Sequence, residues 1–580
     1  MKGQSRGRVT NGLVELECKG NETKLFMEVH PTLSGCFPKL VVSRPSIVHP
    51  MIANGIYKWR GVGEGDLCTS AKITTHSTVT MSKLLSRAAA RAASTSTATQ
   101  TTKAAGDISS VFPSLRPDYK PEPLPPRFQD LKRKLFENNE KALTESWKRL
   151  LPSLEEEVDK IRTKGSDVCL PPYYCMPLYC TVHDEHCVDC YQIIPSVDYA
   201  DVVSGTISES TIKDIRHRGT VVIRNVIPRD KALDYKQCIR DYIASNRERV
   251  KAFPADSPAV YELYWTPGQA KARAHPSMLT TQRFLQRLWH SSDPKTKLST
   301  SNPLTYADRL RIRDPGDAKF ALGPHVDGGS LERWEDPEYS SVYTKILEGN
   351  WEQYDAWDAK HRLNAKMDLY NGAGACSMLR FFQGWMSMSD TAPGEGSLRV
   401  CPMIVHSTAY TILRPFFDVQ SQQPNLDSTF PGSVPGACQE YNPVTHPQLE
   451  LETTMVSVPA VEPGDFVAWH CDMLHSVDKE HRGKGDSSVL YIPATPLCDM
   501  NIDYLLKQRQ AAIDYSPPWD FPGAGGPGEF GFNGAMDWSS LNADGQRAMG
   551  LGNTPWEITD AMTEGEKDAV RWANRACFGL

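Results

Sequence analysis

Apolar residues recur at helical spacing through one long segment of the chain. Between residues 128 and 161 they fall mostly three or four positions apart, with charged residues between them. This period predicts an amphipathic helix whose apolar face packs on a core, and Pro152 predicts a break in it. The proline-rich stretch that starts at Phe112 is expected to be extended. A second helix is expected over residues 230–246, after an apolar strand at 220–226.

Short strands separated by Pro and Gly turns dominate the chain beyond residue 300. Strands are expected over residues 310–313, in two places within 376–402, and over 454–459, 463–469 and 488–493. A His-x-Asp motif follows the first of these strands, and a histidine follows the strand at 463–469. This order is typical of a double-stranded β-helix, the jelly-roll or cupin barrel. The predicted fold class is therefore α+β: a jelly-roll core with flanking helices, long inserted loops and a disordered N-terminal region.

The motif Gly-Pro-His-Val-Asp-Gly-Gly at residues 323–329 indicates a metal site. His325 and Asp327 stand two residues apart, so on a strand both side chains point to the same side. A histidine from a second strand would complete two imidazoles and one carboxylate on one face of a metal ion. With the opposite face open, this set is the facial triad of non-haem Fe(II) oxygenases. Because short motifs recur by chance, the prediction depends on the strand order around the motif.

Three segments carry a resemblance to known proteins: residues 323–337, Phe-Gln-Gly-Trp at 382–385, and Trp-His-Cys-Asp-Met-Leu-His-Ser-Val at 469–477. They resemble the DUF1479 family of fungi and bacteria, within the Fe(II)/2-oxoglutarate dioxygenases of the phytanoyl-CoA hydroxylase type. The resemblance extends from about Phe112 to Met549. It implies the barrel fold, Fe(II), 2-oxoglutarate as co-substrate, O2 and a small-molecule substrate. It implies little about which molecule is oxidised.

The resemblance also implies which residues bind the iron and act in catalysis: His325, Asp327 and His475. His470 competes with His475, because it follows an apolar run directly. His475 sits where the family places its metal histidine, and it is the predicted ligand. His470 is then a neighbour that orients the substrate or supports a ligand.

The co-substrate site departs from the family pattern. The distal carboxylate of 2-oxoglutarate needs a bidentate cation, which phytanoyl-type enzymes supply as an Arg shortly after the distal histidine. Here that register, residues 486–488, reads Asp-Ser-Ser. The candidates are Arg380 and Arg399, which flank the Phe-Gln-Gly-Trp motif, and Arg311 and Arg313, which precede the metal motif. Arg380 is the first predicted substitute, Arg399 the second and Arg313 the third. Trp385 aligns with the tryptophan that borders 2-oxoglutarate. Strict alternation puts Arg380 and Trp385 on opposite faces of a strand, so a bulge or twist is expected between them.

Composition excludes several classes of partner. A net charge of −6 with 23% charged residues gives no basic footprint for nucleic acid. No apolar run reaches the roughly 18 residues that a bilayer requires, so no membrane span is expected. The 15 cysteines are scattered, which together with Fe(II) chemistry favours a reducing intracellular compartment. We expect no secretory leader at Met1.

The N-terminal region shows no sustained period over residues 1–80. From Met81 to residue 106 the chain is rich in Arg, Ser and Ala and contains no acidic residue. This composition is typical of a mitochondrial presequence, although such a leader acts at a free amino terminus. Either translation starts at Met81 and the protein is mitochondrial, or the tract is a disordered linker and the protein is cytoplasmic.

Five cysteines and two histidines crowd residues 169–190. Cysteine pairs at this spacing are typical of zinc sites. The family pattern, however, runs almost directly from Gly165 to Ile194, which favours an insertion, such as a retained intron translated in frame. An isolated segment also lacks the scaffold that brings zinc ligands together.

Two inserted loops, residues 334–366 and 415–448, are expected at the barrel mouth, where substrate recognition usually resides. Residues 332–334 are expected near the pocket. The Gly/Pro-rich tail at 516–533 either wraps the barrel or meets a second subunit in a homodimer. The expected divisions are 1–111 (unassigned or disordered, with the presequence-like tract from Met81), 112–168 (helical), 169–193 (Cys-rich insertion), 194–510 (oxygenase core) and 511–580 (extended arm).

Three functions are compatible with these residues. The first is an Fe(II)/2-oxoglutarate dioxygenase. The second is a non-oxidative cupin enzyme, an isomerase or lyase, which the missing distal Arg keeps open. The third is a barrel that binds without catalysis, against which the intact metal motif argues.

Overall fold

The computed structural model describes residues 112–115, 123–165, 193–319, 321–372, 375–521 and 523–580, together with five short strands before residue 60. The chain divides into two compact units, Met1–Gln100 and Thr101–Leu580. In the first unit an antiparallel sheet and a separate strand pair are present, where the sequence predicted no fold. Their strands are β1 (Gly7–Thr10), β2 (Leu13–Glu17), β3 (Lys24–Glu28), β4 (Met51–Ala53) and β5 (Ile56–Lys58). The presequence-like tract and the Cys-rich segment lie outside the described residues, so both interpretations of each stay predictions.

Two sheets form the centre of the second unit. The larger has eight strands in the order β6 (Ser196–Asp198), β7 (Thr220–Arg224), β17 (Phe466–His470), β13 (Phe382–Ser387), β19 (Ser487–Tyr491), β11 (Leu310–Arg313), β9 (Val260–Tyr261) and β8 (Ala252–Phe253). The smaller has five in the order β15 (Gln439–Glu440), β12 (His325–Val326), β18 (His475–Val477), β14 (Leu398–Val400) and β16 (Val456–Ser457). Neighbouring strands are antiparallel except β6 and β7. Every strand expected from the sequence is present, several of them shorter than expected.

The central strands of the larger sheet are buried along their whole length. All residues of β13 and β17 are buried, so neither strand shows the alternation of a half-exposed sheet. Such strands have one face on other elements and one face on the interior of the fold. Trp289 packs on the helix-covered side, where its ring stacks on Phe381 at 4.3 Å and on His470 at 4.7 Å. The opposite side carries Gln383 and Trp385 toward the interior.

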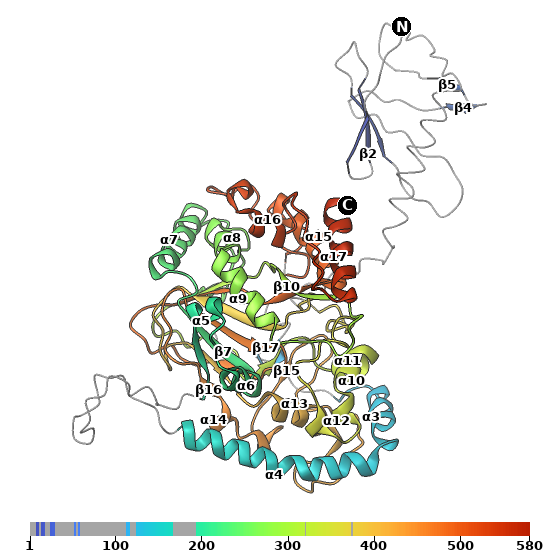
Figure 1. Ribbon diagram of the computed structural model, residues 1–580, viewed down its shortest axis with the longest axis vertical. Helices are drawn as coiled ribbons and strands as arrows, with labels where there is room; N and C mark the ends of the chain where they lie inside the picture. The colour runs from blue at the N-terminus through green and yellow to red at the C-terminus, as the bar shows by residue number, and fades with distance from the viewer. Residues whose placement is uncertain are drawn as a thin grey trace. The chain divides into compact units, whose positions relative to one another are not determined.

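Helices surround the two sheets (Figure 1). Figure 1 shows α4 along one end of the second unit beside α12, α13 and α14, and α15 to α17 at the opposite end. No helix among the described residues is long and apolar enough to cross a bilayer. A further strand pair joins β10 (Leu298–Leu304) to β20 (Thr495–Cys498). The helices are α3 (Arg127–Glu137), α4 (Glu140–Gly165), α5 (Tyr199–Ser204), α6 (Glu209–Arg218), α7 (Arg229–Ser245), α8 (Pro267–Arg273), α9 (Pro276–Gln286), α10 (Glu332–Glu335), α11 (Pro337–Val342), α12 (Thr344–Leu347), α13 (Ile404–Leu413), α14 (Leu451–Thr454), α15 (Asp499–Asp514), α16 (Ala543–Ala548) and α17 (Glu564–Phe578).

The long helix predicted over residues 128–161 is present, but the predicted break at Pro152 is wrong. The chain divides instead at Asn138 and Asn139, between α3 and α4, and Pro152 lies inside the continuous α4. Pro152 is exposed, so water can satisfy the carbonyl that its missing N–H leaves without a partner. The predicted apolar face of α4 is buried, with Trp147 stacked on Phe417 at 4.9 Å.

The Gly/Pro-rich tail packs on its own unit. Glu529 is buried and accepts hydrogen bonds from the backbone N–H groups of Tyr264 and Trp265, at 2.7 and 2.9 Å, and from the hydroxyl of Tyr242. The tail therefore fits the expectation of an arm that wraps the core. A homodimer stays a prediction.

Candidate metal centre

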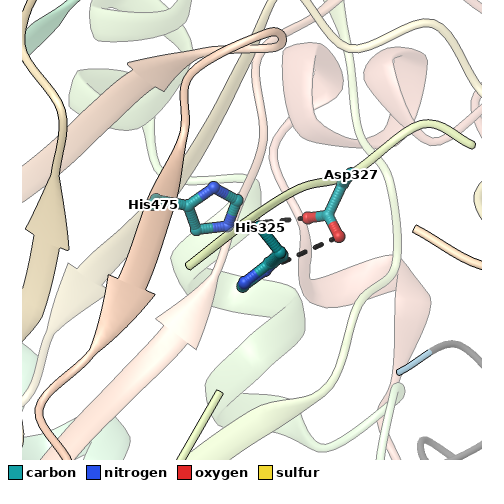
Figure 2. Close-up of side chains that lie close together, drawn as sticks. All are labelled: His325, Asp327 and His475. Carbon is teal, nitrogen blue, oxygen red and sulfur yellow. Dashed lines mark ion pairs between the residues drawn. The ribbon is translucent and has the colours of Figure 1, made fainter. Parts of the chain in front are cut away.

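Three side chains converge at the smaller sheet. His325 on β12 and His475 on β18 are paired directly across the two strands, and their ring centroids lie 4.1 Å apart. Asp327 follows His325 by two residues. Its two carboxylate oxygens lie 3.8 Å from Nε2 of His325 and 3.7 Å from Nε2 of His475. Figure 2 shows the three side chains pointing toward one another, and their ligand atoms all lie within 4.8 Å.

Backbone carbonyls fix the tautomer of both histidines. Nδ1 of His325 lies 2.7 Å from the carbonyl oxygen of Gly323, and Nδ1 of His475 lies 2.9 Å from that of Met473. A carbonyl can only accept, so each Nδ1 carries the proton and donates it. Each Nε2 then presents a lone pair toward Asp327. This hydrogen-bond pattern is typical of histidines that ligate a metal.

The larger sheet holds Asp327 from the other side. The side-chain amide of Gln383 donates to the Asp327 carboxylate, and the indole N–H of Trp469 donates to the amide oxygen of Gln383. Gln383 and Trp469 are paired across β13 and β17. The guanidinium of Arg333 donates to the backbone carbonyl of Asp327 at 2.8 Å. These contacts set the orientation of the carboxylate before any ligand binds.

The two glycines after Asp327 permit its turn. Gly328 and Gly329 have φ of +85° and +79°. A Cβ on Gly329 would lie 2.5 Å from the carbonyl oxygen of Met367, so no other residue fits there. The Asp-Gly-Gly sequence is therefore both a turn former and the support of a candidate ligand.

Electrostatics favours the protonation states that a divalent metal requires. Burial works to raise the pKa of Asp327, but the neighbouring His325, His475 and Arg380 hold it below its usual range. Burial lowers the pKa of His475 to about 3. At neutral pH the cluster thus offers a carboxylate and a neutral imidazole. Two imidazole nitrogens and one carboxylate are the donor set of mononuclear non-haem iron sites, so the residues present fit Fe(II).

His470 has no nitrogen left for a metal. It is fully buried, its Nε2 lies 2.9 Å from the carbonyl oxygen of Ala356, and its Nδ1 accepts from the backbone N–H of Asp472 at 3.0 Å. Asp472 in turn forms a buried ion pair with Arg362 at 2.6 Å. The cluster of His470, Cys471 and Asp472 is therefore satisfied by the chain itself. His475 is the histidine of this segment that faces Asp327.

A cavity of about 190 Å³ opens beside the three side chains. Its walls come from both sheets, from the loop before β11, and from Phe521 of the C-terminal arm. Phe112 closes one side, with its ring edge-on to His325 at 4.8 Å. The inserted loop 415–448 contributes residues 436–438 to the wall, whereas the loop 334–366 borders a smaller neighbouring cavity.

The arginines predicted to bind 2-oxoglutarate lie in different places. Arg380 lines the cavity, and so does Trp385. Arg380 precedes the first residue of β13, so alternation does not apply and no bulge is needed. Arg399 lies outside the cavity wall and donates to the carbonyl of Met455, at 2.6 and 3.0 Å.

Arg313 is also outside the cavity wall, where it ties down the turn after β11. Its guanidinium donates to the carboxylate and carbonyl of Asp317 and to the carbonyls of Asp478 and Lys479. The structure therefore corrects the second and third choices, because both guanidinium groups are bound to other parts of the chain. A cation that the sequence did not rank, Arg311, lines the cavity instead.

Comparison with known proteins places the chain in a family. Residues 184–551 match the family model described as Gig2-like. The chain belongs to the Gig2-like family. The predicted resemblance to DUF1479 proteins is thereby confirmed, since a Gig2 protein of Candida albicans carries that designation.

Similar proteins align with more than half of the chain. The Candida albicans Gig2 structure is 32% identical, has a TM-score of 0.67, and aligns over 79% of this chain and 96% of its own. The Escherichia coli (strain K12) protein YbiU is 36% identical over 368 residues, 62% of this chain and 85% of its own. A Salmonella typhimurium LT2 structure, named provisionally as an oxidoreductase, is 30% identical with a TM-score of 0.63 over 74% of this chain and 99% of its own.

The sequence contained a local signal for two further residues of the site, Gln383 and Arg311. Gln383 precedes Trp385 by two residues, so alternation predicts that both face the interior. Arg311 precedes Arg313 by two residues on the same strand and shares its face. Phe112 and Phe521 carried no such signal, because their contacts with the cavity depend on tertiary packing.

Proposed function

We propose that the protein is an Fe(II)/2-oxoglutarate-dependent oxygenase that hydroxylates a small molecule. The observation that carries the proposal is the convergence of His325, Asp327 and His475 beside a cavity. Both Nε2 atoms and the carboxylate face one another, and the Nδ1 protons are held elsewhere. These three donors would hold a metal ion from one side only. The side that faces the cavity would keep its coordination positions open for other ligands.

Strand order supports a double-stranded β-helix as the core of this enzyme. Along the chain, β11, β13, β17 and β19 belong to the larger sheet, whereas β12, β14, β16 and β18 belong to the smaller. The four strands of each group are neighbours in their sheet. Two four-stranded antiparallel layers connected in this alternating way are what a jelly roll requires.

The residues of the chain position the reactants. His325, Asp327 and His475 would hold Fe(II), and Gln383 and Arg333 keep Asp327 in place. When bound, Fe(II) and 2-oxoglutarate would supply the chemistry of C–H hydroxylation by O2, coupled to loss of CO2 from 2-oxoglutarate. The aromatic ring of Phe112 and the burial of both histidines keep bulk water from the site.

Arg311 is our choice for the distal carboxylate of 2-oxoglutarate. Phytanoyl-type enzymes place their arginine on the strand that corresponds to β19, and β19 has no cation here. Arg311 lies on the adjacent strand β11, where it is paired with Val489 of β19. Arg311 is 5% exposed and lies in the cavity wall beside Tyr491, which in turn is paired with Trp385. A buried cation thus lines the cavity from the strand next to β19.

Changing Arg311→Met should weaken 2-oxoglutarate binding to the iron-loaded protein by about 2–5 kcal/mol, the loss typical when one partner of a buried charge pair is removed. Arg399→Met is the matched control, since Arg399 lies outside the cavity wall and should leave the affinity nearly unchanged. Equilibrium dialysis of labelled 2-oxoglutarate under anaerobic conditions measures both variants. Unchanged affinity in Arg311→Met would remove Arg311 from this role.

A further inference from the structure

Arg380 is a cation that faces the cavity without a partner. No hydrogen bond or ion pair joins its guanidinium to any of the described residues, although it lines both the main cavity and the smaller one beside Asp327. Two other arginines near the cavity are held by the chain: Arg309 lies near Glu262 and Asp308, and Arg333 binds two backbone carbonyls. Placing a guanidinium away from bulk water is costly unless a counter-charge arrives.

The surroundings keep Arg380 charged. Burial works to lower the pKa of Arg380, but the nearby Cys376 and Asp327 hold it above its usual value. Asp327 accepts from Gln383 and is a candidate iron ligand, and Asp308 accepts from the backbone N–H of Arg309 at 2.7 Å. The acids near Arg380 therefore have other roles, and its own fork of N–H donors points to a ligand.

Arg380 and Arg311 approach the cavity from different elements. Arg311 lies within β11, beside Tyr491 in the depth of the sheet. Arg380 stands before the start of β13, among Cys376 and Tyr306, close enough to Asp327 and His475 to affect their pKa values. Besides Arg309, the cavity wall thus contains Arg311 and Arg380 at separate positions, and Arg380 lies next to the candidate metal ligands.

Resting on the proposed function, we propose that the substrate is a small carboxylic acid whose carboxylate pairs with Arg380, while Arg311 takes 2-oxoglutarate. A single guanidinium matches the two oxygens of a carboxylate. A phosphate dianion fits less well, because Asp308 and Asp327 line the same cavity and would repel the second charge. The cavity of about 190 Å³ limits the substrate to a small molecule.

Binding of matched acids and amides tests this assignment. Valerate, 3-hydroxybutyrate and gluconate, each with its neutral amide, are titrated by calorimetry into the full-length protein loaded anaerobically with Fe(II), with and without saturating 2-oxoglutarate. At least one acid should bind the wild type about 30-fold or more tightly than its amide, the factor that corresponds to losing one partner of a buried charge pair. Arg380→Met should weaken the binding of that acid by a similar factor, and Arg380→Lys should weaken it by less. Arg311→Met should leave the affinity for the acid unchanged and weaken the binding of 2-oxoglutarate.

The outcomes separate the two proposals. If no acid binds the wild type, or if the amides bind as well as the acids, the Arg380 assignment is overturned, and this comparison needs no variant. If Arg380→Met loses 2-oxoglutarate while Arg311→Met retains it, Arg380 serves the co-substrate, so the substrate inference fails and the proposed function stands. If acids bind through Arg380 but the wild type never binds 2-oxoglutarate, the oxygenase proposal fails and the anion site at Arg380 stands.

Discussion

Replacing His475 with alanine should abolish stoichiometric Fe(II) binding, whereas replacing His470 with alanine should leave it in place. His475 offers a free Nε2 toward Asp327, because its Nδ1 proton is donated to the carbonyl of Met473. Both nitrogens of His470 are used by the chain, at Ala356 and Asp472. Iron bound per protein is measured after anaerobic loading and desalting, with circular dichroism to confirm folding.

His470 is also the stability control in this pair. Its ring is fully buried and stacks on Trp289 at 4.7 Å, so His470→Ala should lower the free energy of unfolding by about 2–5 kcal/mol, as for other large buried side chains. His475→Ala should lower the free energy of unfolding by less, since the ring of His475 borders the cavity. Loss of iron in the folded His470→Ala variant, with iron retained in His475→Ala, would reverse the ligand assignment.

Breaking the buried ion pair of Arg362 with Asp472 should strongly destabilise the second unit. The two side chains are 3% and 4% exposed, and the hydroxyl of Tyr343 also donates to Asp472 at 3.1 Å. Asp472→Ala leaves the Arg362 charge buried without its partner, so the free energy of unfolding should fall by about 3–5 kcal/mol. Urea denaturation followed by tryptophan fluorescence measures the change.

An exposed ion pair provides the control for this experiment. Lys345 and Glu348 lie in the same inserted loop, with side chains 50% and 45% exposed. Glu348→Ala should change stability by less than about 1 kcal/mol, because water screens such pairs. If Asp472→Ala and Glu348→Ala lower the free energy of unfolding by the same small amount, the ion pair of Arg362 with Asp472 does not stabilise the loop 334–366.

The ion pair of Arg362 with Asp472 also predicts that stability depends on pH. Burial works to raise the pKa of Asp472, but Arg362, His470 and Arg333 hold it well below its usual range. A carboxyl whose folded pKa is depressed contributes stability at neutral pH that is lost as the pH falls below its unfolded pKa. The difference in stability between the wild type and Asp472→Ala should therefore shrink as the solution is acidified.

Local patterns predicted seven of the thirteen strands of the two central sheets, together with the candidate metal cluster. His-x-Asp sets two side chains on one face by geometry alone, and the register of β12 and β18 then brings His475 opposite His325. The choice between His470 and His475 could not be made from spacing. It depends on Ala356, which lies in an inserted loop far from His470 in the sequence and occupies its Nε2.

The arginines show where sequence reasoning reaches its limit. Arg311 and Arg313 alternate onto the same face of β11, yet only Arg311 lines the cavity. Arg313 is bound by Asp317 and by carbonyls of residues 478–479, contacts that form only when distant turns meet. The break between α3 and α4 is similar, because the exposed Pro152 is tolerated while the chain turns at Asn138. Each outcome depends on tertiary partners that a local pattern does not contain.

The central claim is that one Fe(II) held by His325, Asp327 and His475 accepts 2-oxoglutarate in the adjoining cavity. Anaerobic titration of the Fe(II)-loaded wild-type protein with 2-oxoglutarate, followed by visible absorption, tests it most directly. The predicted result is a weak charge-transfer band that saturates at one 2-oxoglutarate per iron and is absent from His475→Ala. A wild-type protein that binds one iron but shows neither the band nor any bound 2-oxoglutarate would contradict the claim. It would favour a metal-dependent enzyme of the non-oxidative cupin type.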